Sequence, residues 1–193
     1  MAKLSDLIIS KVRVKLLKVF FSQPKEMFYV RQLTRATKEE INAVRRELLH
    51  LQNIGLLKSE KRGNRLYYHI RTAYPLFSEI SNLVAKSTGP GRFIIKNKNK
   101  LGYVKFALMS QKLLRSEVRT PEDVDLLIVG KLLMPQVAQI VKQVEKQLQT
   151  EINYSVMTED EFQYRRDHFD PFIIKVLLQP KVLLIGDESQ LAQ

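Results

Sequence analysis

The sequence predicts an α+β protein built from two small domains. Apolar positions recur at helical spacing through most of residues 4–86, interrupted by one hairpin, whereas residues 101–193 alternate short apolar strands with amphipathic helices. Charge divides the chain as well, because residues 1–116 carry 24 Lys and Arg against 7 Asp and Glu, and residues 117–193 carry 8 against 13. The resulting net charges, +17 and −5, indicate that the N-terminal part meets a polyanion.

The whole-chain composition excludes several classes of protein. The 193 residues include no cysteine, so the sequence predicts neither a disulfide framework nor a thiolate metal site. The apolar runs are too short for a membrane helix and the N-terminus lacks a signal-peptide pattern, so we expect a cytoplasmic protein without a membrane partner. The histidines, His50, His69 and His168, do not have metal-ligand spacing.

The N-terminal domain begins with two predicted helices. Apolar residues recur at helical spacing over residues 4–21, and the pattern stops before Pro24. A short helix is predicted through residues 31–36, with Leu33 facing inward.

The third helix is predicted over residues 38–53. Thr37 and Glu40 have the spacing of a capping box, in which each side chain binds the backbone amide of the other residue, so the helix is expected to begin at about Lys38. Apolar residues follow at spacings of three and four, and Gly55 ends the helix. On its outer side lie polar and charged side chains that can reach base edges and phosphates. These candidate DNA-binding residues are Lys38, Glu39, Asn42, Arg45 and Arg46.

A basic hairpin follows this helix. Residues 57–61 and 65–70 are predicted as strands, joined by a turn whose glycine and asparagine tolerate positive φ. The candidate DNA-binding residues at its tip are Lys61, Arg62, Asn64 and Arg65. A basic hairpin directly after an exposed polar helix is typical of a winged helix-turn-helix domain, which binds double-stranded DNA.

Residues 10–72 resemble the winged-helix domain of ArsR-type transcriptional regulators. The similar segments are Val44-Arg45-Arg46-Glu47-Leu48, Ile54-Gly55-Leu56-Leu57 and Arg62-Gly63-Asn64-Arg65-Leu66-Tyr67-Tyr68. The resemblance implies that the helix at 38–53 enters the major groove and that the hairpin touches the flanking backbone or minor groove. A winged helix used only for protein contacts is the alternative.

One more amphipathic helix is predicted to begin at Pro75 and to complete a domain spanning residues 1–86. Its apolar stripe is Leu76, Ile80, Leu83 and Val84. In the regulators that the domain resembles, the first and last helices build a twofold dimer, so the resemblance implies a homodimer. Packing of the stripe within its own domain is the alternative.

Residues 87–100 are expected to form a basic linker. Ser87-Thr88-Gly89-Pro90-Gly91 has the composition of a hinge, and lysine then alternates with asparagine over residues 96–100. A solvated loop is the expected structure, and a segment that lies along nucleic acid or grips a nucleotide is the alternative.

The second domain, residues 101–193, is predicted as a small α/β layer. A helix is expected over 135–149, and the capping pair Thr158 and Glu161 begins another that runs toward Leu178. The predicted strands are 103–109, 123–129, 152–157 and 181–185.

Asp123 and Asp125 are the candidate metal ligands of this domain. At positions i and i+2 of a strand, both side chains point to the same face. Neighbouring carboxylates repel each other unless a cation lies between them, which favours a weak Mg²⁺ site for handling nucleotide phosphates. Two solvated charges at a strand edge are the alternative.

With Ser110, these aspartates resemble the minimal nucleotidyltransferase fold, over most of residues 100–188. In that fold a strand ending in Gly-Ser leads through a loop to an Asp-x-Asp strand. Here Met109 replaces the glycine, and the strand that should supply a third carboxylate offers Asn153. The resemblance therefore implies a degenerate nucleotide site formed by Ser110, Asp123 and Asp125.

Three functions remain open from the sequence. The first is a DNA-binding transcriptional regulator whose nucleotidyltransferase-like domain has no catalytic residue and serves for sensing or assembly, with a nucleotide as candidate ligand. The second is an active nucleotidyltransferase, with Asp123 and Asp125 catalytic, that adenylylates a partner protein as antitoxins of this fold do. The third is a nucleic-acid-binding assembly protein without regulation. No cofactor is expected other than Mg²⁺ at the two aspartates.

Overall fold

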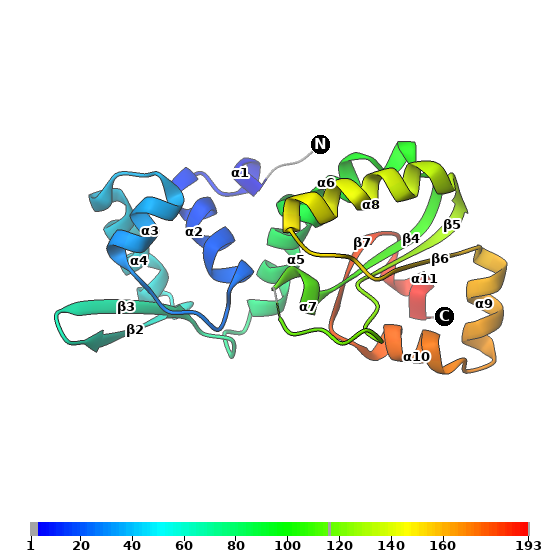
Figure 1. The fold of residues 1–193 in the computed structure, drawn as a ribbon. Coiled ribbons are helices and arrows are strands. Elements are labelled where there is room, and N and C mark those ends of the chain that lie inside the picture. The colour runs from blue at the N-terminus through cyan, green and yellow to red at the C-terminus, as the bar shows by residue number, and fades with distance from the viewer. Residues whose placement is uncertain (1–3, 116, 193) are drawn as a thin grey trace. The chain divides into compact units, whose positions relative to one another are not determined.

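The computed structural model describes residues 4–115 and 117–192 (Figure 1). The chain divides after Ser87 into two compact units. The first consists of helices and a small antiparallel sheet of three strands, and the second of a mixed four-stranded sheet with helices, which confirms the α+β prediction. In the described ranges, no helix is long and apolar enough to cross a membrane.

The first unit packs its helices on one face of its sheet, whose strand order is β1-β3-β2 with antiparallel pairs. Its core includes Phe20, Leu33 and Leu48, which are fully buried. The elements are α1 (Leu4–Leu7), α2 (Lys11–Ser22), β1 (Phe28–Tyr29), α3 (Val30–Thr37), α4 (Ile41–Asn53), β2 (Leu57–Arg62), β3 (Arg65–Ile70) and α5 (Phe77–Ser87). The predicted hairpin is present as β2 and β3.

The helix predicted over residues 4–21 is divided in two. Ser10 lies between α1 and α2, and its hydroxyl accepts a hydrogen bond from the amide of Arg13 at 3.2 Å. The same hydroxyl donates to the carboxylate of Glu47 on α4 at 2.6 Å, and Arg13 Nε donates to that carboxylate at 2.8 Å. A serine that caps a new helix interrupts a continuous one, and here the cap also ties α2 to α4.

The predicted capping box is wrong in its partners. Thr37 ends α3, and its hydroxyl donates to a carbonyl within that helix. Glu40 is itself the cap of α4, because its carboxylate accepts from the amides two and three residues further on, at 2.8 and 2.9 Å. Lys38 has a left-handed backbone, with φ of 54°, so α4 begins at Ile41 rather than at about Lys38.

The second unit has the strand order β6-β5-β4-β7, in which β5 and β6 are parallel and the other pairs antiparallel. On one face of this sheet α9, α10 and α11 share a core with Phe106 and Leu108, and Figure 1 shows α6 and α8 together on the other side. The elements are α6 (Gly89–Lys96), the 3-10 helix η1 (Lys98–Lys100), β4 (Gly102–Ser110), α7 (Gln111–Leu114), β5 (Leu126–Leu132), α8 (Met134–Leu148), β6 (Tyr154–Met157), α9 (Glu159–Asp167), α10 (Pro171–Leu178), β7 (Lys181–Ile185) and α11 (Glu188–Ala192).

Residues 87–100 were predicted as a basic linker, but Ser87 ends α5 in the first unit and residues 88–100 fold with the second unit. Pro90 lies in the first turn of α6, where its missing amide costs no hydrogen bond. Ile94 of α6 and Leu101, which follows η1, are fully buried. Of the alternating lysines, Lys96 ends α6, and Lys98 and Lys100 belong to the exposed turn η1. The helix predicted toward Leu178 is likewise divided, because Asp170 caps α10.

Met109 is a core residue. It pairs with Leu126 across β4 and β5, and both side chains are fully buried. Strand alternation places Met109 on the face opposite Leu108. Replacing Met109 with glycine would therefore leave a cavity in the core and would not open a path for a phosphate.

We expect Met109→Ala to lower the free energy of unfolding by about 2–5 kcal/mol, because the truncation leaves a cavity. Urea denaturation measures the change. The matched control is Met134→Ala, at a side chain that is 48% exposed, where the expected change is within about 0.5 kcal/mol. Equal losses for the two variants would contradict the packing of Met109.

Candidate functional site

Polar and basic side chains are exposed on one face of α4 and at Lys38, the C-cap of α3. Four of the predicted DNA-binding residues are exposed there: Lys38, Asn42, Arg45 and Arg46. Arg45 Nη1 donates to Asn42 Oδ1 at 3.3 Å, which holds the two side chains together. Glu39 differs, because its carboxylate binds Lys15 Nζ of α2 at 2.5 Å. Glu39 is therefore engaged within the unit and is not presented with the other four.

Two arginines of the hairpin and two tyrosines of the sheet form an arginine–tyrosine cluster. Tyr29 of β1 lies opposite Tyr67 of β3, with ring centroids 5.6 Å apart in an edge-on arrangement. The Arg65 guanidinium lies 4.7 Å from the Tyr29 centroid, and the Arg62 guanidinium lies 5.9 Å from that of Tyr67. Such contacts restrict the arginines and leave their charges at the surface.

Arg62 and Arg65 differ in their charged partners. Arg62 Nε binds Glu60 at 3.0 Å, and this hydrogen bond and the carboxylate charge raise the pKa of Arg62. No carboxylate in the described ranges forms an ion pair with Arg65, so its positive charge is the less compensated of the two. Lys61 and Asn64 are also exposed at the tip.

The two tyrosines of the arginine–tyrosine cluster were not predicted from the sequence. The alternation of Arg65 and Tyr67 on β3, out of phase with the buried Tyr68 and Ile70, was a usable signal for Tyr67. Tyr29 had no such signal, because its pairing with Tyr67 joins segments far apart in the sequence.

Asp123 and Asp125 lie in the segment that leads into β5, which begins at Leu126 rather than at Asp123. Both are buried, with exposed fractions of 6% and 2%. The carboxylate of Asp123 accepts hydrogen bonds from Lys112 Nζ, at 2.9 and 3.0 Å, and from the amide of Thr120 at 2.8 Å. The Thr120 amide and the Lys112 ammonium lower the pKa of Asp123 to about 2.

Asp125 is paired with a different cation. Its Oδ2 accepts from the Arg119 guanidinium and from the amide of Asn153, the latter at 2.9 Å. Arg119 also donates to the Thr150 hydroxyl at 2.7 Å. The hydrogen bonds of Arg119 with Thr150 and of Asp125 with Asn153 therefore join the segment before β5 to the segment after α8. Asp125 Oδ1 is buried without a hydrogen-bond partner in the described ranges.

Ser110 adjoins these aspartates through its backbone. Its amide donates to the carbonyl of Asp125 at 2.8 Å, and its hydroxyl caps α7 by accepting from the amide of Lys112 at 3.1 Å. Asn153, in the place expected for a third carboxylate, donates from its side chain to the carbonyl of Asp123 at 2.9 Å. Lys112 and Arg119 were missed, because both lie outside the periodic segments and nothing in their spacing pairs them with the aspartates.

The cluster does not fit Mg²⁺ as it is arranged. Lys112 holds both carboxylate oxygens of Asp123, and Arg119 and Asn153 hold one oxygen of Asp125. Only Asp125 Oδ1 remains for a metal, whereas Mg²⁺ takes an octahedral set of oxygen ligands. Within residues 4–115 and 117–192, no group of three or more histidines and carboxylates is placed to hold a metal ion.

We expect the fold to lose the stabilisation from Asp123 at low pH. Because its pKa is lowered from 3.8 to about 2, the ionised carboxylate stabilises the folded state above pH 3.8, and this contribution disappears as the pH falls to about 2. The test compares the free energy of unfolding of the natural sequence and of Asp123→Asn across that range. The difference should shrink as the pH falls, and a constant difference would contradict this role of Asp123.

The chain was compared with protein-family models, curated proteins and solved structures, and none of the three comparisons finds a match. Its function is therefore inferred from the residues and from the contacts described above.

Proposed function

We propose that the protein is a DNA-binding transcriptional regulator of the winged helix-turn-helix type. The observation that carries this proposal is the presence, in one unit, of an exposed polar and basic face on α4 and of a hairpin with Arg62 and Arg65 at its tip. In this arrangement α4 reads base edges in the major groove, and the hairpin contacts the flanking backbone or minor groove.

The distribution of charge supports the proposal. Residues 1–87, which make up the first unit, contain 17 Lys and Arg against 7 Asp and Glu, whereas residues 88–193 contain 15 against 13. The excess of positive charge lies in the unit that carries the α4 face and the hairpin. Such a field attracts DNA phosphates and makes binding depend steeply on salt concentration.

The exposed part of α5 supports a homodimer. Val84 is buried against the first unit, whereas Leu76, just before the helix, and Leu83 are 53% and 45% exposed. The apolar stripe thus packs partly within its own unit and leaves leucines that a second copy of the chain would cover. A twofold dimer would present two α4 helices to two half-sites in DNA.

For the second unit we propose a degenerate nucleotidyltransferase-like domain that senses a ligand or mediates assembly. The ion pairs of Asp123 with Lys112 and of Asp125 with Arg119 support this reading, because an active enzyme of that kind needs these carboxylates for metal ions. An active nucleotidyltransferase is the second candidate. The observation that favours it is the convergence of Ser110, Asp123 and Asp125, with Asp125 Oδ1 buried and unsatisfied.

Selection from a random pool of duplexes, followed by affinity measurements at several salt concentrations, tests DNA binding. Arg46→Ala and Asn42→Ala should each reduce the preference for the selected site by about 1–3 kcal/mol, if each side chain binds a base edge. Arg65→Ala should weaken binding to all duplexes and reduce the salt slope by about 1, because one phosphate contact is lost. We expect Arg62→Ala to have a smaller effect, because Glu60 already compensates its charge.

The matched control is Lys142→Ala, which removes one exposed positive charge from α8. The affinity of this variant for DNA should equal that of the natural sequence, apart from the small decrease caused by the loss of one positive charge. Binding that is unchanged after Asn42, Arg46 and Arg65 are all replaced would remove α4 and the hairpin from the DNA interface.

Incubation with labelled nucleoside triphosphates and Mg²⁺ distinguishes the two proposals for the second unit. We expect no transfer by the natural sequence, and we expect calorimetry to show tighter Mg²⁺ binding by Lys112→Met, because this change frees the carboxylate of Asp123. Transfer that is abolished by Asp125→Asn would instead establish the active enzyme.

A further inference from the structure

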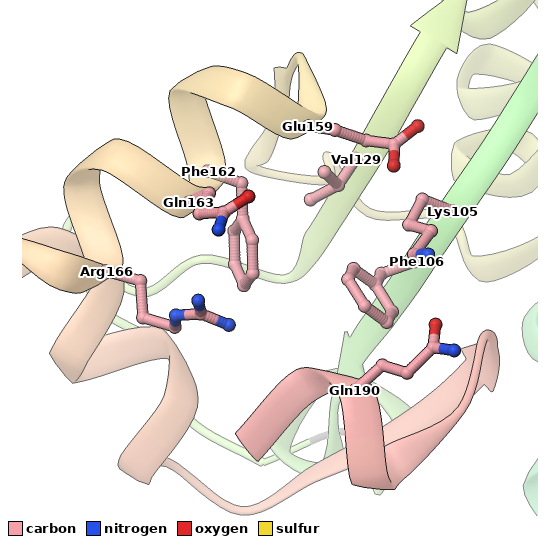
Figure 2. Close-up of a pocket in the computed structure, with 8 residues that line it drawn as sticks. All are labelled: Lys105, Phe106, Val129, Glu159, Phe162, Gln163, Arg166 and Gln190. Atoms are coloured by element: carbon pink, nitrogen blue, oxygen red, sulfur yellow. The ribbon is translucent and has the colours of Figure 1, made fainter. Parts of the chain in front are cut away.

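A pocket of about 380 Å³ lies on one face of the four-stranded sheet (Figure 2). Its lining comes from β4, β5, α9 and α11, which are separate segments of the sequence. Phe106, Val129 and Phe162 form an apolar floor, and all three are buried. Lys105, Glu159 and Arg166 are charged groups around this floor. The volume is within the range of about 300–1,000 Å³ that is typical of small-molecule sites.

The pocket is distinct from the aspartate cluster. Its floor contains the cross-strand pair Phe106 and Val129, whereas the aspartates precede Leu126, which pairs with Met109. These two pairs are three residues apart, or about 10 Å along the strands. None of the residues that line the pocket belongs to the cluster.

A β-bulge brings Lys105 into the pocket. Val104 pairs with Gly130 and Phe106 pairs with Val129, so Lys105 is an extra residue without a partner on β5. A bulge interrupts strand alternation and redirects a side chain, and Figure 2 shows Lys105 and its neighbour Phe106 lining the same pocket. The bulge requires glycine at position 130, where φ is 149° and a Cβ atom would lie 2.1 Å from a backbone oxygen of Tyr103.

The pocket is lined by positive and negative side chains that do not form ion pairs with one another. Across residues 4–115 and 117–192, neither Lys105 nor Glu159 forms an ion pair. Arg166 differs, because its guanidinium binds the carboxylate of Asp167 at 3.0 Å. The Lys105 ammonium lies 5.9 Å from the ring centroid of Phe106, so the pocket presents an ammonium and a carboxylate that have no ion-pair partner in the described residues. Gln163 and Gln190 add amide groups that can donate and accept hydrogen bonds.

We propose that this pocket binds a small zwitterion with an apolar side chain, of the chemical class of a free α-amino acid. A ligand with only a negative charge would be attracted by Lys105 and repelled by Glu159, and a ligand with only a positive charge would experience the reverse. A zwitterion directs its carboxylate to Lys105 and its ammonium to Glu159, while its side chain covers the floor at Phe106 and Phe162. This inference does not depend on DNA binding.

Calorimetry on the full chain, with L-leucine and L-phenylalanine as probes, tests the proposal. We expect saturable binding of at least one of them. Lys105→Gln and Glu159→Gln should each weaken that binding about 10-fold or more, because each removes a hydrogen bond between charged groups. Phenylacetate, which lacks the ammonium, and phenethylamine, which lacks the carboxylate, should bind the natural sequence more weakly than L-phenylalanine.

Matched controls separate the loss of a ligand contact from a loss of structure. Lys142→Gln on α8 and Glu161→Gln on the exposed side of α9 make the same chemical changes outside the pocket and should leave binding unchanged. In Glu159→Gln, phenylacetate should bind more tightly than in the natural sequence, a gain that misfolding cannot produce. No binding of either amino acid at millimolar concentration, or binding of phenylacetate as tight as that of L-phenylalanine, would overturn the proposal.

Discussion

Neutralisation of two buried carboxylates is the constraint on which the second unit depends. Asp123 and Asp125 are buried just before the inner strand β5, and a buried charge without a partner strongly destabilises a fold. Lys112 and Arg119 supply the opposite charges from the segment between β4 and β5, and the Thr120 and Asn153 amides donate one further hydrogen bond to each carboxylate. The segments that precede β5 and β6 are therefore joined by charged hydrogen bonds, in addition to the burial of Val124 in the core.

The first unit separates its core from its proposed DNA-binding surface within single elements. Along α4, Val44 and Leu48 are fully buried, whereas Arg45 and Arg46 are exposed. Along β3, Tyr68 is buried while Arg65 and Tyr67 lie on the outer face. The apolar residues determine how each element packs, so the positions between them are free to carry the charge that DNA binding needs.

The sequence was a good guide to periodic elements and a poor one to their junctions. Spacing predicted α4, the β2–β3 hairpin and the strands of the second unit, because burial of one face requires that spacing. Ser10, where the helix breaks, contacts Glu47, which is distant in sequence, and the cap of α4 is Glu40 while the adjacent Glu39 binds Lys15 of α2. In the candidate site, Ser110, Asp123 and Asp125 came from a motif, whereas Lys112 lies in the short helix α7 and Arg119 in a loop, and their partners follow only from the folded chain.

The cap of α4 has a consequence for how the proposed complex would hold DNA. The free amides at a helix N-terminus often bind a phosphate directly, through rigid backbone atoms. In α4 the carboxylate of Glu40 already occupies two of these amides, and those bonds lower the pKa of Glu40 and keep it negatively charged. The negative charge of Glu40 would therefore repel a DNA phosphate at this end of the helix. In the proposed complex, the DNA phosphates would instead be bound by long, flexible side chains such as Arg45 and Arg65. Such side chains would allow the angle of α4 in the major groove to differ from one DNA site to another.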